Sequence, residues 1–167
     1  MALFLDRLLL HCWTDNTRTP PVQHWSIRLS VLLSPAGAAP LATTQPPRSW
    51  VLDTGFTGEA FAWRHHLEAA GLDPDQERGI PLSLRWSATG GRVQVPTREA
   101  DLWLVGNRPG VGTFYLPLDG GVAFVDRRMA APDPELHRAL IGLRTLRRAR
   151  LTVEIDFASD TVSIRTP

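Results

Sequence analysis

The sequence has one cysteine, Cys12, and no lysine, so all of its 18 basic residues are arginine. A single cysteine can form neither an internal disulfide nor a cysteine metal site, so we expect a fold that is compatible with a reducing compartment. The 18 arginines are balanced by 17 acidic residues, which leaves a formal net charge of +1. This balance gives no reason to expect a nucleic acid or an anionic membrane as partner.

Long hydrophobic runs are also absent. The first ten residues are mostly apolar, but Asp6 and Arg7 interrupt them, no basic segment precedes them and no small-residue cleavage site follows. We therefore expect neither a signal peptide nor a membrane span, and a cytoplasmic location. The 167 residues are enough for one domain with its own core. We predict a single domain over residues 23–167, preceded by an N-terminal extension, residues 1–22, of uncertain structure.

Strand-like patterns dominate the chain. Apolar and polar residues alternate from Trp25 to Val31, as in a half-buried strand, and Trp50-Val51-Leu52 is a short apolar strand. Further strands are predicted at residues 102–105, 114–118, 122–125, 151–157 and 161–164, with Ser159-Asp160 turning the last hairpin. Two short helices are predicted at residues 64–70, where Gly71 provides the stop, and at residues 143–148. The sequence therefore predicts an all-β, mainly β fold with one or two short helices.

A glycine pair marks one of the predicted hairpins. Residues 80–86 and 92–95 are strand-like and flank a tip composed of Ser87, Ala88, Thr89, Gly90 and Gly91. Trp86 directly precedes this tip, so it could line substrate pockets. The six tryptophans are dispersed along the sequence without interleaved basic residues, so we expect most of them to pack in the core, not to stack on bases.

The segment of greatest chemical interest is Asp53-Thr54-Gly55-Phe56-Thr57-Gly58. Asp-Thr-Gly alone is a weak signal, because a chain of this size contains it by chance in roughly a few per cent of cases. Here it directly follows the apolar strand, precedes the glycine-tipped hairpin and is answered near the C-terminus by Leu140-Ile141-Gly142. In this order, over residues 25–164, the features resemble the retropepsin-like aspartic proteases, and the first motif is similar to that of single-domain bacterial members.

The resemblance implies a closed β-barrel of the acid protease type and a role for each motif. Asp53 would be the catalytic carboxylate, and Thr54, Gly55 and Thr57 would support its loop. The hairpin tip, residues 87–91, would be a flap. The segment formed by Leu140, Ile141 and Gly142 would brace the loop from behind. No metal or cofactor is needed for this chemistry. Arg144 departs from the family pattern, which often has an acidic residue there.

The chemistry of this family requires two carboxylates, of which one holds a proton while the other stays ionised. The chain has one Asp-Thr-Gly and no Asp-Ser-Gly, so it supplies only half of the pair. The resemblance therefore implies a homodimer in which a two-fold axis passes between two copies of Asp53. The predicted function is an aspartic endopeptidase that cleaves peptide or protein substrates.

Two other functions stay open. The fold can serve as a catalytically inactive dimerisation or peptide-binding module, which the substitution Asp53→Asn would leave unchanged. Alternatively, the chain is a β-rich interaction domain in which Asp53 is an ordinary turn residue that hydrogen-bonds to its own backbone.

Two clusters of ionisable residues outside this motif have simpler interpretations. His65 and His66 precede Glu68, but neighbouring histidines are expected to point to different helix faces, and their spacing matches no zinc signature. The cluster of Arg144, Arg147, Arg148 and Arg150 is interpreted as a solvated helix face, because cations are favourable near a helix C-terminus.

Overall fold

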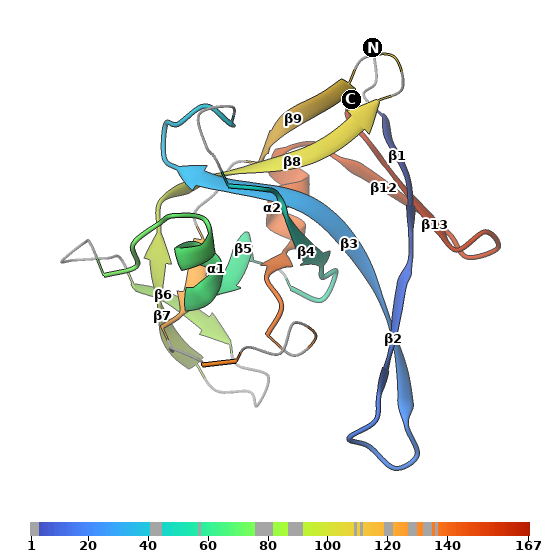
Figure 1. The fold of residues 1–167 in the computed structure, drawn as a ribbon, viewed down its shortest axis with the longest axis horizontal. Coiled ribbons are helices and arrows are strands. Elements are labelled where there is room, and N and C mark those ends of the chain that lie inside the picture. Colours follow the sequence, from blue (N-terminus) through green and yellow to red (C-terminus); the bar gives the residue numbers. More distant parts are fainter. Residues whose placement is uncertain are drawn as a thin grey trace.

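The computed structural model describes residues 4–40, 45–56, 58–75, 82–86, 92–108, 110, 112–118, 122–126, 130–131, 135 and 137–167. In this part the chain is mainly β with two short helices, which confirms the predicted all-β class (Figure 1). None of the described helices is long and apolar enough to cross a membrane.

Most strands belong to one large sheet. They are β2 (His11–Asp15), β3 (Val22–Pro35), β4 (Arg48–Leu52), β5 (Ala60–Trp63), β6 (Leu82–Trp86), β7 (Arg92–Arg98), β8 (Ala100–Arg108), β9 (Gly112–Leu118), β10 (Val122–Val125) and β11 (Leu140–Ile141). The strand order is β6-β7-β10-β5-β11-β4-β3-β8-β9, and β2 also pairs with β3. Two pairings, β10 with β5 and β11 with β4, are parallel, and the others are antiparallel.

This sheet is open in the part of the chain that the structure describes. Its pairing path ends at β6 on one side and at β9 on the other, so the sheets there do not close into the barrel that the resemblance implied. The predicted hairpin is present, because β6 and β7 pair antiparallel from Trp86 and Arg92 outward. Its tip, residues 87–91, lies outside the described residues.

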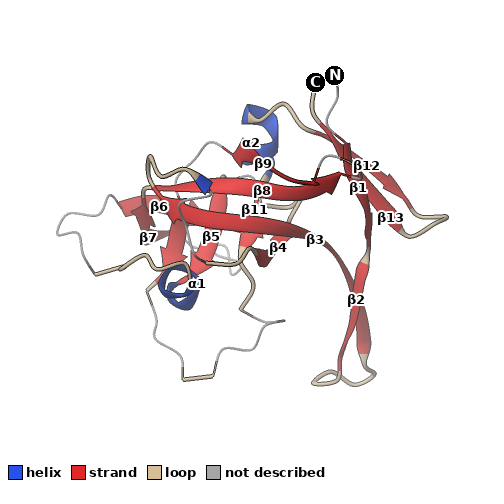
Figure 2. Ribbon diagram, turned by 45° about the horizontal axis from the view of Figure 1, so that its top comes forward, coloured by secondary structure: helices blue, strands red, loops and turns tan. Residues whose placement is uncertain are grey.

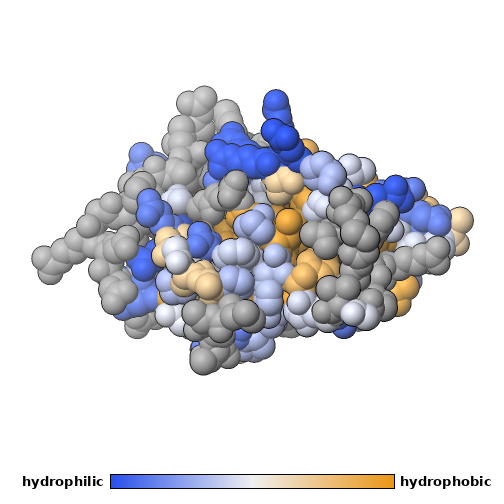
Figure 3. Space-filling model, turned by 90° about the horizontal axis from the view of Figure 1, so that it is seen from above, coloured by the Kyte–Doolittle hydropathy of each residue, from blue (hydrophilic) through white to orange (hydrophobic). Residues whose placement is uncertain are grey.

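A second sheet of three strands joins the two ends of the chain. It consists of β1 (Phe4–Leu9), β13 (Thr161–Arg165) and β12 (Thr152–Asp156), in the order β1-β13-β12. Both chain ends therefore lie close together in the two ribbon views (Figures 1 and 2). In the space-filling view from above, hydrophobic residues are visible among hydrophilic ones (Figure 3). Three large exposed apolar side chains, Leu9, Ile155 and Phe157, belong to this sheet or its hairpin.

The two predicted helices are confirmed as α1 (Arg64–Ala69) and α2 (Leu143–Arg148). Gly71 follows α1 with φ of +74°, a left-handed conformation that favours glycine and ends the helix. Helix α2 starts directly after Gly142, so it begins where β11 ends.

The core is built from the alternation that the sequence shows. Ile27, Leu29, Val31 and Leu33 are buried along β3, and Trp50 of β4 is 1% exposed. Trp25 follows the same alternation but is 55% exposed, so the expectation of core packing is wrong for it. The reason is the β2–β3 hairpin, which extends away from the rest of the sheet and carries Trp25 beyond the core (Figures 1 and 2).

Candidate active site around Asp53

Asp53 lies at the point where a buried strand leaves the sheet. Strand β4 ends in the buried residues Trp50, Val51 and Leu52, and Asp53 follows them, partly buried. The turn then passes through Thr54 and Gly55, both of which are exposed. The Gly55 N–H donates a hydrogen bond of 2.9 Å to Oδ1 of Asp53, and the Phe56 N–H donates one of 3.1 Å to the Asp53 carbonyl. One carboxylate oxygen is thus held by its own loop. Thr57, predicted to support this loop, lies outside the described residues.

The segment of residues 139–144 holds the strand that leads into this turn. Strand β11 lies between β4, to which it is parallel, and β5, to which it is antiparallel. The Val51 N–H donates to the Ala139 carbonyl at 2.8 Å, and the Asp53 N–H donates to the Ile141 carbonyl at 3.0 Å. The backbone of Asp53 is therefore fixed by the predicted Leu140-Ile141-Gly142 segment.

The same segment also holds the far side of the loop. The N–H groups of Gly142 and Leu143 donate to the carbonyls of Glu59 and Phe56 at 2.7 and 2.9 Å. The N–H of Arg144 donates to the Gly58 carbonyl at 3.2 Å. The structure thus brings the Asp-Thr-Gly loop and the Leu140-Ile141-Gly142 segment, which are far apart in the sequence, into direct contact through their backbones.

Gly142 makes this contact possible because it has no side chain. A Cβ atom there would lie 2.6 Å from the Phe56 carbonyl oxygen and even closer to that of Gly58. These are backbone atoms, so no side-chain rotation could relieve the overlap. The φ of Gly142 is −98°, which any residue can adopt. Close packing under the loop, and not backbone conformation, is therefore what requires glycine at this position.

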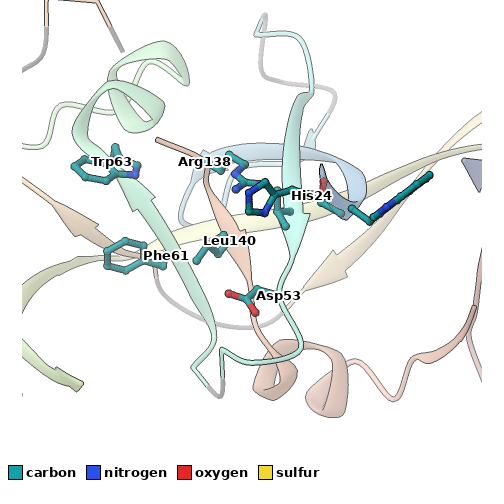
Figure 4. Close-up of a pocket in the computed structure, with 9 residues that line it drawn as sticks. His24, Asp53, Phe61, Trp63, Arg138 and Leu140 are labelled. Carbon is teal, nitrogen blue, oxygen red and sulfur yellow. The ribbon is translucent and has the colours of Figure 1, made fainter. Parts of the chain in front are cut away.

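A pocket of about 430 Å³ opens beside the Asp53 carboxylate (Figure 4). Its walls come from the β2–β3 hairpin, from the ends of β4 and β5 and from the segment that leads into β11. The lining residues are His24, Trp25, Ser26, Val51, Asp53, Phe61, Trp63, Arg138 and Leu140. The volume is within the range of small-molecule and peptide side-chain pockets. Asp53 is the only acid among the described residues that line it.

Sequence reasoning missed most of this wall. His24, Trp25 and Ser26 belong to the β2–β3 hairpin, and Phe61 and Trp63 belong to β5, which was not predicted. The available signal was the pair of apolar residues at alternate positions, Phe61 and Trp63, just before the predicted helix. The partners of β5 are residues 122–125 and 140–141, so its pairing depends on distant parts of the chain.

Arg138 brings a positive charge to the same pocket. Its guanidinium carbon lies 5.4 Å from the centre of the Trp13 ring, and Trp13 stacks on His24 at 4.7 Å between ring centres. Cation–π contact of this kind is attractive and orients the guanidinium. The pocket therefore combines aromatic walls with one carboxylate and one guanidinium.

The two neighbouring histidines lie outside this pocket and correct one expectation. The rings of His65 and His66 are 4.0 Å apart, so they do not point to different helix faces. His66 turns back to the start of α1, where its Nδ1 accepts a 3.2 Å hydrogen bond from the Trp63 N–H. In the described part of the chain, no three metal-ligating side chains meet at one point.

Comparison of the chain with models of known protein families, with curated proteins and with solved structures found no match.

Proposed function

We propose that the chain is an aspartic endopeptidase of the retropepsin-like type, which hydrolyses peptide bonds with Asp53 and the Asp53 of a second copy. The observation that carries this proposal is the double attachment of the Asp53 loop to residues 139–144, with Gly142 packed beneath it. A surface turn needs no such support. A carboxylate that must meet its symmetry mate within hydrogen-bonding distance does need it, because small displacements cost catalysis heavily.

The exposure of the loop suits a two-fold partner. Thr54 and Gly55 are exposed, and so is Leu143, at 40%, whose N–H is bonded to the loop. A second copy can approach Asp53 at this surface without displacing any core residue. The apolar side chains of the three-stranded sheet, Leu9, Ile155 and Phe157, offer further surface that a partner would cover.

In such a dimer, two carboxylates at close range cannot both ionise, so one keeps a proton. The ionised carboxylate takes a proton from a water molecule as the water oxygen attacks the peptide carbonyl carbon. The protonated carboxylate hydrogen-bonds the carbonyl oxygen, which becomes negatively charged. The C–N bond then breaks as the nitrogen receives a proton from the carboxyl group. No metal or cofactor takes part.

The pocket suggests which peptides fit. Phe61, Trp63 and the exposed Trp25 form aromatic walls close to Asp53, so we expect an apolar side chain next to the cleaved bond. The predicted flap, residues 87–91, would lie on the β6–β7 hairpin, whose two strands are paired as a flap requires.

One alternative function has an observation in its favour. The bond from the Gly55 N–H to Asp53 Oδ1 is also what an ordinary turn aspartate makes, as expected of a β-rich interaction domain in which Asp53 has no catalytic role. Only activity separates the two functions.

The deciding experiment is cleavage of a broad peptide library at neutral and mildly acidic pH, over a range of protein concentrations. Wild type is compared with Asp53→Asn and with Asp160→Asn, a matched control at an exposed turn whose φ of 51° asparagine tolerates. We expect activity that rises more than linearly with concentration, persists in the control and disappears in Asp53→Asn. Equal cleavage by all three proteins, or none by any, would contradict the proposal. Peptide binding without cleavage would favour the inactive peptide-binding module.

A further inference from the structure

A second pocket, of about 280 Å³, lies between α1, the adjoining parts of β3 and β4, and the segment of residues 137–138. Its lining is dominated by groups that can donate hydrogen bonds to an anion. Three arginines and three histidines line it: Arg28, Arg48, Arg138, His65, His66 and His137. No acidic residue lines it among those that the structure describes.

Two of the arginines that line this pocket, Arg48 and Arg138, have no carboxylate partner among the described residues. The third, Arg28, is paired with Glu135, which does not line the pocket. Arg48 is exposed at the start of β4, and Arg138 lies against the Trp13 ring. The charges of Arg48 and Arg138 therefore are not neutralised by described side chains, and a pocket between them attracts negative charge.

Two of the histidines, His65 and His66, add donors whose charged form is disfavoured by burial. Burial lowers the pKa of His65, and the nearby His137 lowers it further. Burial, His65 and, to a smaller extent, Arg48 and His137 lower the pKa of His66 to about 4. The Nδ1 atom of His65 is enclosed, yet it has no hydrogen-bond partner among the described residues. A neutral imidazole still presents one N–H, so the ring can donate to an anion.

We propose that this pocket binds an oxyanion, either a phosphate group or the terminal carboxylate of a peptide, held by Arg48 and Arg138 with imidazole donors beside them. Guanidinium groups bind both of these anions in a forked geometry. Arg138 also lines the pocket that contains Asp53 (Figure 4), so the two pockets adjoin. A peptide held by its carboxylate would therefore extend toward Asp53. The anion site itself does not depend on the proposed catalytic function.

The test uses the full chain and reads the five histidine side chains by ¹H–¹⁵N NMR during titrations. The probes are inorganic phosphate and the tripeptide Ala-Ala-Ala, with its C-terminally amidated form as the control ligand. We expect saturable shifts for the three histidines that line the pocket. His11 and His24 do not line this pocket, so their shifts should be smaller.

Substitutions of single arginines test whether the anion binds in this pocket. Because a hydrogen bond to a charged group contributes about 1.5–3 kcal/mol, Arg48→Gln and Arg138→Gln should each weaken binding about tenfold or more. Arg147→Gln, on the exposed side of α2, removes the same charge elsewhere and should leave binding unchanged. Arg48 is exposed and makes no ion pair with a described residue, so its replacement should not unfold the protein.

The outcomes separate the sources of the anion. Saturation by phosphate alone would support a site for a phosphate group. Saturation by the free tripeptide but not by its amide would support a site for a peptide carboxylate. The proposal is overturned if neither probe saturates, or if both pocket variants bind as the wild type does. Since no cleavage is measured, failure here says nothing against the role of Asp53, and failure of cleavage says nothing against this site.

Discussion

Replacing Gly142 by alanine should damage the protein far more than its size suggests. The added methyl group would overlap the carbonyl oxygens of Phe56 and Gly58, and neither can move unless the loop that carries Asp53 moves. Overpacking of this kind costs about 1–3 kcal/mol. If the loop shifts, hydrogen bonds from residues 142–144 to the loop are weakened, each worth about 0.5–1.5 kcal/mol. We expect a total loss of about 2–5 kcal/mol.

Urea unfolding measures this loss, and Gly37→Ala is the matched control. Gly37 has φ of +78° and open space around it. Alanine there should therefore lower the free energy of unfolding only through its unfavourable backbone conformation, by about 1 kcal/mol. Gly142 has the reverse situation, an ordinary φ and no space. With a urea slope of about 1–3 kcal/mol per M, the midpoint of Gly142→Ala should fall by about 0.7 M or more. A loss no larger than that of Gly37→Ala would refute the claim that close packing under the loop requires glycine.

Two further predictions concern α1. Arg64 is buried and binds three carboxylates, those of Glu68, Asp75 and Asp126. These acids are about half exposed, so Arg64→Met should cost about 1–3 kcal/mol in urea unfolding, and a loss below that of Asp75→Asn would contradict this. Burial lowers the pKa of His66 to about 4, so only the unfolded chain takes up its proton as the pH falls from 6.5 to 4. This histidine should therefore contribute a loss of about 2–3 kcal/mol over that window, and none below it. The variant His66→Asn keeps an acceptor for the Trp63 N–H but has no titrating group at this position. The stability of the variant should therefore depend less steeply on pH than that of the wild type. Parallel pH profiles of the two proteins would show that His66 is not the source of the pH dependence.

Much of the local structure was predictable because local rules encode it. The strand from Trp25 onward follows from alternation, and the end of α1 follows from Gly71, whose positive φ the structure shows. The last hairpin turns at Asp160, which has φ of 51°, as a turn aspartate allows. In each case the neighbouring residues alone carry the information.

The arrangement of strands was less predictable because it depends on distant pairing. Strand β5 has four residues and lies between β10 and β11, which follow it by scores of residues. The extension of uncertain structure contains β1, which pairs with β13 at the opposite end of the chain, and β2, which pairs with β3. Local sequence patterns do not predict which strand a segment will pair with.

The candidate site shows the same division. The motif at Asp53 and the segment ending in Gly142 were recognised from their order, and the structure shows that their backbones meet. The aromatic wall was not recognised, because the sequence pattern predicts Trp25 to be a core residue. In the structure Trp25 lies in the β2–β3 hairpin, which extends beyond the core. The catalytic role proposed for Asp53, the supporting roles of Thr54, Gly55 and Thr57, and the flap role of residues 87–91 remain predictions.

The attachment of the loop bears on how a dimer would form. In one copy, the backbone of Asp53 is already fixed at its N–H by Ile141, and the loop beyond it is fixed by residues 142–144. A partner would therefore have to supply a carboxylate but would not have to order this loop. Association pays for every segment that it immobilises, so a preformed loop lowers the cost of assembling the pair. If Asp53 acts as a pair, as proposed, the preformed loop would allow a weakly associating dimer to be active, and cleavage would then depend on protein concentration.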